Sequence, residues 1–267
     1  MTSAAEPTLR FDDGAAYERG MGVWSQLAGD VFLDWLMPSA GLRWVDVGCG
    51  SGAFTELLAK RCAPAETQAI DPSEDQLAFG RARMATRQAV FRQANAMALP
   101  FEDGHFDAAV MALVIFFVPD PAKGVAEMAR VVRPGGLVAA YAWDVTSGGL
   151  PFEPIRSELG SMGVQLPLPP NANVSRRAAL HALWTGAGLQ SVETRAISVQ
   201  RSFDGFDDFW NTNMLIGGLA ETLAAIGAND AEQVKDRVRA LLSANETGRI
   251  TCHAQANAVR GRVPVSF

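Results

Sequence analysis

The stretch Trp44-Val45-Asp46-Val47-Gly48-Cys49-Gly50-Ser51-Gly52-Ala53 combines three local signals. Residues 44–47 form a short, mainly apolar run that is typical of a buried strand. Glycines follow at alternate positions, and a helical pattern with its apolar residues on one face begins directly after them. Glycine lets the backbone approach a ligand closely, and a helix N-terminus carries unpaired N–H groups and a partial positive charge. Strand, glycine turn and helix together therefore predict a nucleotide-binding geometry.

The glycine spacing satisfies two different binding fingerprints. Gly48-x-Gly50-x-x-Ala53 fits the dinucleotide fingerprint, which accepts alanine at its third position. Asp46 followed by glycines 48, 50 and 52 also fits the acidic-x-Gly-x-Gly-x-Gly loop of class I S-adenosylmethionine (SAM) methyltransferases. Asp71 follows the next predicted strand, residues 66–70, where a carboxylate accepts hydrogen bonds from ribose hydroxyls. Both hypotheses use that carboxylate, so the loop and Asp71 do not decide between the two cofactors.

Length, charge and cysteine usage restrict the classes of function. With 267 residues the chain can form one large α/β domain with additions. Its formal net charge of −6 argues against a general nucleic-acid or anionic-membrane surface, because such surfaces need clustered positive charge. Three cysteines without metal-ligand spacing argue against a disulfide framework or a zinc site. We therefore expect a small-molecule substrate, no nucleic-acid partner and no bound metal.

The sequence also bears on location. The N-terminal segment MTSAAEPTLR has no apolar core of signal-peptide length. The longest apolar run, residues 108–118, is too short to cross a membrane. These features predict a cytoplasmic protein without membrane association. Separately, we expect a monomer or a homodimer.

Strand and helix patterns alternate through the middle of the chain. Apolar runs at 89–92, 106–111 and 137–143 predict three further strands, with helical segments between them. Such alternation predicts an α/β fold with a doubly wound, mostly parallel sheet and right-handed crossovers. Within one globular domain, we expect an N-terminal helical cap at 1–40, the α/β core at 41–145, a substrate-covering insertion and helix at 146–188, and strands and a helix that complete the sheet at 189–267.

Four segments carry a resemblance to a known family. They are VDVGCGSG at 45–52, the acid of AIDPS at 69–73, ALPFEDGHFD at 98–107 and VVRPGG at 131–136. With them, the run from Val45 to Asp144 resembles class I SAM-dependent methyltransferases of the small-molecule type, the methyltransferase 11/25 group. A dinucleotide dehydrogenase has no reason to carry the last two segments at these spacings. The flanking motifs MGVWS, AWD, FDDFW and AVRG are similar to one bacterial subgroup, so the resemblance covers most of the chain.

The resemblance implies a fold, a cofactor and a set of site residues. It implies a seven-stranded Rossmann-like sheet whose last strand, residues 249–260, runs antiparallel. Before that strand, residues 203–244 have a helical pattern with a possible break near 227–230. The implied activity is a SAM-dependent methyltransferase that releases S-adenosylhomocysteine (SAH). The residues assigned to the cofactor are Asp46, Gly48, Cys49, Gly50 and Gly52 at the methionine part, Asp71 and Pro72 at the ribose, Asn95 and Ala96 at adenine, and Met111, Tyr17 and Trp24 alongside.

This chain departs from the family pattern at three places. Asn95 stands where the family usually has an aspartate that meets the adenine amino group, and its amide oxygen can still accept that bond. Val23 stands where relatives with the MGxWS segment often have arginine. Residues 115–118 are Ile-Phe-Phe-Val where relatives often carry histidine, so we carry no acid–base chemistry over to them.

Catalysis requires little of the protein in this reaction class. Methyl transfer from a sulfonium is an in-line displacement with a neutral leaving group, so the main task is to position the nucleophile. A general base is needed only for a protonated oxygen or nitrogen nucleophile. Asp144 is the candidate base, since it follows the fifth strand at the carboxyl edge, where ligands bind in such sheets. The alternative is that it caps the strand end. His105 precedes the fourth strand at the opposite edge, and we expect His181 and His253 to be structural.

Two alternatives to a methyltransferase stay open. An NAD(P)-type oxidoreductase is supported by the glycine loop and Asp71 alone. A SAM-binding protein without catalysis would act through partners, with the apolar Phe116-Phe117 region and the C-terminal helix as contacts. Residues 146–173 bear on the acceptor: this Gly-, Pro- and Ser-rich segment is either an apolar cover over the substrate or a surface loop. The apolar residues of that cover would be Leu150, Phe152, Met162, Leu166 and Leu168.

Overall fold

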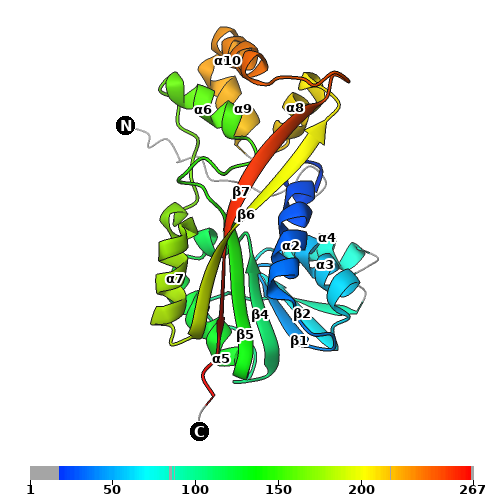
Figure 1. Cartoon of the computed structure of the whole chain (residues 1–267), viewed down its shortest axis with the longest axis vertical. Coiled ribbons are helices and arrows are strands. Elements are labelled where there is room, and N and C mark those ends of the chain that lie inside the picture. The colour runs from blue at the N-terminus through cyan, green and yellow to red at the C-terminus, as the bar shows by residue number, and fades with distance from the viewer. Residues whose placement is uncertain (1–17, 84–85, 87, 217, 266–267) are drawn as a thin grey trace.

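The computed structural model describes residues 18–83, 86, 88–216 and 218–265. At its centre is a seven-stranded sheet with the order β3-β2-β1-β4-β5-β7-β6 (Figure 1). Strands β1 to β5 pair in parallel, whereas β7 runs antiparallel to both β5 and β6. The predicted doubly wound sheet with an antiparallel last strand is confirmed. The strands are β1 (Arg43–Val47), β2 (Glu66–Asp71), β3 (Ala89–Gln93), β4 (Phe106–Ala112), β5 (Val132–Trp143), β6 (Gln190–Phe203) and β7 (Ile250–Arg262).

The strand order creates a crevice beside β1. Strands β2 and β3 lie on one side of β1, and β4 and β5 lie on the other. Because the order reverses between β1 and β4, the loops at the carboxyl ends of these two strands diverge, and ligands bind at such points in α/β sheets. The glycine turn directly follows β1, so the fold places it at the border of this crevice.

Helices cover both faces of the sheet (Figure 1). Ser73 caps the helix that follows it, since its hydroxyl accepts a hydrogen bond from the backbone N–H of Gln76. None of the described helices has the length and apolar character needed to cross a membrane. One face carries α2 (Val23–Leu36), α3 (Ala53–Cys62) and α4 (Glu74–Ala82), and the other carries α5 (Pro121–Val131) and α7 (Arg177–Gly186).

The expected N-terminal cap belongs to this helical layer. The π-helical turn η1 (Glu18–Gly22) leads into α2, which packs on α3 and on β6. Trp24 is fully buried with its ring near that of Phe203, and the rings of Phe32 and Tyr141 have centroids 4.7 Å apart. Helix α2 therefore contributes to the core of the sheet layer, and its first turn reaches the cavity described below.

A second group of helices lies beyond the carboxyl edge of the sheet, on the protruding ends of β6 and β7 (Figure 1). We call this group the upper layer. The predicted break near 227–230 is confirmed, since Gly227 has a φ of 90°. The helical pattern predicted for residues 203–244 misses a second interruption at Gly218, whose φ is 89°. Phe203 ends β6 instead of starting this helical region. The upper layer consists of α6 (Glu153–Ser161), α8 (Phe206–Asn213), α9 (Leu219–Ile226) and α10 (Ala228–Leu241).

Strand β5 begins earlier than the sequence predicts. Its pairing with β4 starts at Val132, shifts register and resumes at Leu137. The Arg-Pro-Gly-Gly segment is therefore an irregular start of the strand rather than a separate turn. The guanidinium of Arg133 donates to the carboxylate of Asp107 on β4, which ties this irregular segment to the neighbouring strand.

Candidate functional site

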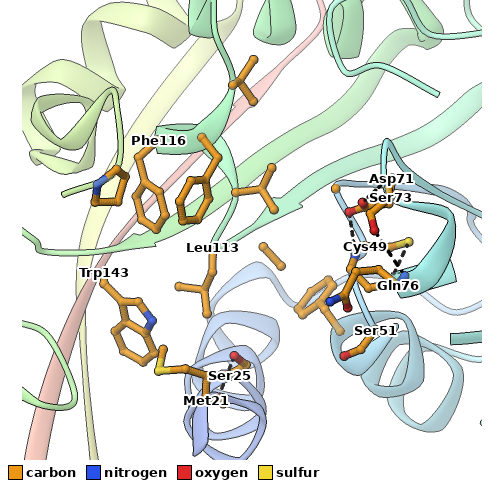
Figure 2. Close-up of a pocket in the computed structure, with 18 of the residues that line it drawn as sticks. Met21, Ser25, Cys49, Ser51, Asp71, Ser73, Gln76, Leu113, Phe116 and Trp143 are labelled. Atoms are coloured by element: carbon orange, nitrogen blue, oxygen red, sulfur yellow. Dashed lines mark hydrogen bonds between the residues drawn. The ribbon is translucent and has the colours of Figure 1, made fainter. Parts of the chain in front are cut away.

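A cavity of about 700 Å³ lies between the carboxyl edge of the sheet and the upper layer. Ligand sites for small molecules have volumes of roughly 300–1,000 Å³. Figure 2 shows that its two ends differ: Asp71, Ser73 and Gln76 gather at one end, and Phe116 and Trp143 lie at the other. We call the first the glycine-turn end, formed by residues 46–51, 71–76 and 94–96. We call the second the apolar chamber, formed by Leu113, Phe116, Phe117, Trp143, Leu150 and Phe152.

The glycine turn depends on glycine both for its backbone angles and for space. Gly48, Gly50 and Gly52 have φ values of 77°, 51° and 81°, a region in which other residues are strained. A Cβ on Gly48 would lie 2.4 Å from Cγ1 of Val114, and one on Gly52 would lie 3.3 Å from a backbone atom of α4. Gly48, Cys49 and Gly50 line the cavity, whereas Gly52 lies outside its wall and holds the turn close to α4.

Asp46 brings a buried carboxylate to the wall of the cavity. Its Oδ2 accepts a hydrogen bond of 2.7 Å from the hydroxyl of Thr55, and its Oδ1 has no partner among the described residues. Burial raises the pKa of Asp46 to about 7; the Thr55 bond opposes that shift and the nearby Asp71 carboxylate adds to it. A cation placed against Oδ1 would favour the charged form of this carboxyl.

Asp71 connects the end of β2 to the glycine turn and lines the same end of the cavity. Its Oδ2 accepts from the backbone N–H of Gly50 and its Oδ1 from that of Ser73, each at 2.9 Å. Burial raises the pKa of Asp71, and these two backbone bonds oppose the increase. Each oxygen keeps a lone pair for a further donor, so the carboxylate can serve the loop and a ligand together. Pro72 lies beside it in the wall.

Asn95 and Ala96 reach the wall from the end of β3. The side-chain oxygen of Asn95 accepts a 2.9 Å hydrogen bond from the backbone N–H of Met97, which fixes the loop in an Asx turn. One acceptor position of the amide is therefore already in use. The sequence predicts that Asn95 lies near a ligand, but it does not predict that its side-chain oxygen already accepts a hydrogen bond from Met97.

Besides Gly52, two described residues predicted for the cofactor lie outside the cavity wall. Trp24 and Met111 are fully buried in the core and lie outside the cavity wall. Met111 faces α5, since a Cβ on Gly124 would lie 3.4 Å from its Cε. Tyr17 lies outside the described residues.

Asp144 also lies outside the cavity wall, although Trp143 and Val145 on either side of it belong to that wall. Its Oδ2 accepts from the side-chain amide of Gln255 at 3.3 Å, and its backbone bonds with Gln255 and Gly149 hold the turn after β5. This is the strand-end arrangement that the sequence leaves open as the alternative to a general base.

No histidine among the described residues lines the cavity. His105 lies near Glu66 at the start of β2, at the edge of the sheet opposite the cavity, with 3.4 Å between its Nε2 and the carboxylate. His181 is on α7 and His253 is on β7, as predicted. The same described residues hold no cluster of three or more His, Cys, Asp or Glu side chains that could ligate a metal.

The apolar chamber contains most of the wall residues that sequence patterns miss. Leu113 follows β4 with a φ of 62°, a strained conformation for a residue other than glycine. Phe116 and Phe117 follow in the short helix η3 (Ile115–Phe117), with ring centroids 4.7 Å apart. Asn171 ties the segment after β5 to η3, since its backbone N–H donates to the carbonyl of Phe116 at 3.0 Å. Four of the five expected apolar residues of that segment line the cavity: Leu150, Phe152, Leu166 and Leu168.

Known proteins share this sequence and fold. Residues 45–140 match the family described as methyltransferase domain. An uncharacterized protein of Mycobacterium tuberculosis is 32% identical over 194 residues, which are 71% of this chain and 69% of that protein. A demethylmenaquinone methyltransferase of Staphylococcus aureus is 39% identical over 100 residues, 37% of this chain and 42% of the relative.

A solved structure extends the comparison to the whole fold. Phosphoethanolamine N-methyltransferase 2 of Haemonchus contortus, in complex with SAM, matches with a TM-score of 0.57 at 18% identity, covering 94% of this chain and 56% of that one. At that identity the likeness bears on the fold. Together with the methyltransferase-domain match and the sheet order, it identifies the class: the chain belongs to the class I SAM-dependent methyltransferase family.

Proposed function

We propose that the protein transfers a methyl group from SAM to a small-molecule acceptor, with both held in the cavity. The observation that carries the proposal is the unpartnered Oδ1 of Asp46 beside the glycine turn, at one end of a cavity whose other end is apolar. An unpartnered carboxylate oxygen in the wall of a cavity suits a ligand that carries an ammonium group. The family match and the SAM complex of the Haemonchus contortus neighbour support the same assignment.

The residues at the glycine-turn end fit the parts of SAM. Oδ1 of Asp46 would accept from the ammonium of the methionine part, and the backbone of Gly48 to Gly50 would face its carboxylate. Asp71 would accept from the ribose hydroxyls while keeping its two backbone bonds. Asn95 and Ala96 would meet the adenine. When bound, SAM supplies a methyl group on a sulfonium, which leaves as a neutral thioether.

The chain itself positions the acceptor. Fixed orientation of two reactants can contribute roughly 7–11 kcal/mol to lowering a barrier. The side chains of Leu113, Phe116 and Trp143 are buried and form a mainly apolar wall beyond the glycine turn. We place no general base at Asp144, because the residue lies outside the cavity wall and its Oδ2 accepts from Gln255. The hydroxyl of Tyr141 donates to the carbonyl of Ser25 and is likewise engaged.

The two alternatives are less well supported. An NAD(P)-type oxidoreductase shares the loop and Asp71, but it does not account for the methyltransferase-domain match. A SAM-binding protein without catalysis would use Phe116 and Phe117 as partner contacts. Phe116 is only 3% exposed and lines the cavity, so it is not available as a surface contact in this conformation.

Calorimetric titration with SAH and with NAD tests the cofactor. We expect SAH to bind with one-to-one stoichiometry and to raise the melting temperature, as a ligand selective for the folded state does. NAD should produce no binding heat. Heat from NAD with none from SAH would overturn the proposal.

A further inference from the structure

Polar and apolar groups are separated in the cavity wall, and this separation bears on the acceptor. Seven polar side chains of the wall belong to the glycine-turn end and are accounted for by the cofactor part of the site: Asp46, Cys49, Ser51, Asp71, Ser73, Gln76 and Asn95. The apolar chamber beyond them is formed by leucine and aromatic side chains from η3, the end of β5 and the segment that follows it. Any molecule in the chamber is therefore in contact mainly with hydrocarbon.

Three polar side chains border the chamber, and each has an internal partner. The hydroxyl of Ser25 donates to the carbonyl of Met21 at 3.0 Å, and the hydroxyl of Tyr141 donates to the carbonyl of Ser25 at 3.3 Å. The guanidinium of Arg156 donates to both carboxylate oxygens of Glu153, at 2.8 and 2.6 Å. Arg156 is the one positively charged residue among the described residues of the wall, and its charge is already paired.

One donor in the chamber wall has no partner. Nε1 of Trp143 makes no hydrogen bond within the described residues, and the residue is only 3% exposed. An indole N–H can only donate. Figure 2 shows the ring nitrogen on the side of the indole that faces Leu113, with the Met21 side chain beside the ring. Because methionine side chains are flexible, Met21 can move aside and let an oxygen atom of a ligand lie next to this nitrogen.

We propose, resting on the proposed function, that the methyl acceptor is an uncharged, mainly apolar phenol or enol, one oxygen of which accepts a hydrogen bond from Nε1 of Trp143. A charged acceptor would lose its hydration in the chamber without meeting a free opposite charge. A phenol or enol hydroxyl is acidic enough to release its proton to the bulk solvent as the methyl group is transferred, so it suits a chamber that offers no base. The oxygen lone pair forms the bond to the methyl carbon, the carbon–sulfur bond breaks, and its electrons stay on the sulfur of SAH.

Binding to the SAH-saturated protein tests this class without requiring turnover. The fluorescent probe N-phenyl-1-naphthylamine, which is uncharged, should bind, and 2-naphthol should displace it. Its charged analogue 6-hydroxy-2-naphthoate, which keeps the rings and the phenol, should displace it at least about tenfold less effectively, because its carboxylate must be desolvated. Equal or tighter binding of the charged analogue would overturn the proposal.

Two variants distinguish the effect of a charge added inside the cavity from the effect of the same charge added elsewhere on the surface. Leu168→Asp adds a charge at a cavity residue that is 47% exposed, so folding should be preserved. We expect at least fivefold weaker probe binding with unchanged SAH affinity. Leu241→Asp makes the same change at a 59% exposed position on α10 outside the cavity wall and should alter neither. Equal probe binding by the parent and Leu168→Asp would contradict an apolar acceptor chamber.

Trp143→Phe tests the hydrogen bond, because it keeps an aromatic ring and removes the donor. Loss of one neutral hydrogen bond should weaken 2-naphthol about fivefold. Naphthalene, which has no oxygen, should bind the variant and the parent alike. If both ligands weaken equally, the indole acts by shape and the oxygen assignment is wrong. Failure of SAH to bind the parent would instead reject the proposed function, so the two failures are distinguishable.

Discussion

The glycine-turn end and the apolar chamber are built in different ways, although they share one cavity. The glycine-turn end comes from short loops after β1, β2 and β3, and it acts through backbone angles and a few fixed oxygen atoms. The chamber collects side chains from the loop after β4, from η3, from the end of β5 and from the segment after β5, and it acts through their shape and their lack of charge. The first arrangement is constrained by stereochemistry, whereas the second depends on side-chain volume, so substitutions should affect the two ends very differently.

The largest effect is expected at Gly48. Gly48→Ala would place a Cβ 2.4 Å from Val114 in a backbone conformation with φ of 77°. Overpacking and the left-handed conformation each cost roughly 1–3 kcal/mol, so SAH affinity should fall on the order of a hundredfold, with a lower melting temperature. Calorimetry and thermal melting measure both.

Gly163→Ala is the matched control for that variant. Gly163 has a similar φ of 78°, but a Cβ added there would have open space within 4 Å. The variant should lose only the modest stability that the backbone angle requires and keep SAH affinity. Equal losses of affinity in both variants would show that the close approach of Val114 to the turn is unimportant.

Asp71→Ala should have the next largest effect. The change removes the acceptor for a ribose and the two backbone bonds that hold Gly50 and Ser73. Since hydrogen bonds to charged groups contribute about 1.5–3 kcal/mol each, SAH should bind at least about tenfold more weakly. Asp75→Ala, an exposed acid at the start of α4, is the control and should bind SAH like the parent. A parent-like dissociation constant for Asp71→Ala would remove this carboxylate from the site.

Asp46 should make cofactor binding depend on pH. Its pKa in the folded protein is about 7, so the carboxyl must lose a proton before it can pair with an ammonium. SAH affinity should therefore rise roughly tenfold between pH 6 and pH 7.5, and Asp46→Asn should remove this dependence. Titrations in buffers of different ionisation heat would detect the released proton. A parent protein with a flat profile over this range would argue against an ion pair at Asp46.

The same pKa has the opposite consequence for the stability of the free protein. The folded-state pKa of about 7 lies above the ordinary value of 3.8. Between these values the folded protein holds a proton that the unfolded chain has released. The stabilisation from this group is therefore fully present below about pH 4 and is lost as the pH rises through 7.

Sequence patterns predicted the glycine-turn end well because its determinants are local. Three glycines, a strand-ending acid and a helix cap each express a requirement of their own backbone position. The mostly parallel sheet was also predictable, since apolar runs alternate with helical patterns. The chamber was predicted only in part. The segment after β5 was expected to supply apolar residues and does so, but contacts such as Tyr141 with Ser25 join segments that sequence patterns treat separately.

Asp144 illustrates a position at which the sequence leaves two roles open. Neighbouring residues of an extended segment point to opposite sides, so Trp143 and Asp144 cannot both face the cavity. The strand position alone does not say which of them does, and the apolar environment of the chamber is compatible with the indole. Leu113 is harder still, since no pattern in the sequence announces a strained φ at a leucine.

The smallest effect is expected at Asn95, and its direction tests how the adenine is held. The Asn95 oxygen accepts from the N–H of Met97, which leaves the NH₂ group of the amide as the free edge. In Asn95→Asp, one carboxylate oxygen can keep the Met97 bond and the other can accept from the adenine amino group. Charge-assisted bonds are roughly twice as strong as neutral ones, so SAH should bind about two- to fivefold more tightly. Asn95→Leu removes the loop bond and the polar edge together and should weaken SAH more than the aspartate strengthens it. If the aspartate variant binds more weakly than the parent, the amide donates to an adenine ring nitrogen instead. If both variants bind like the parent, Asn95 serves the turn at Met97 alone and adenine lies elsewhere along the wall.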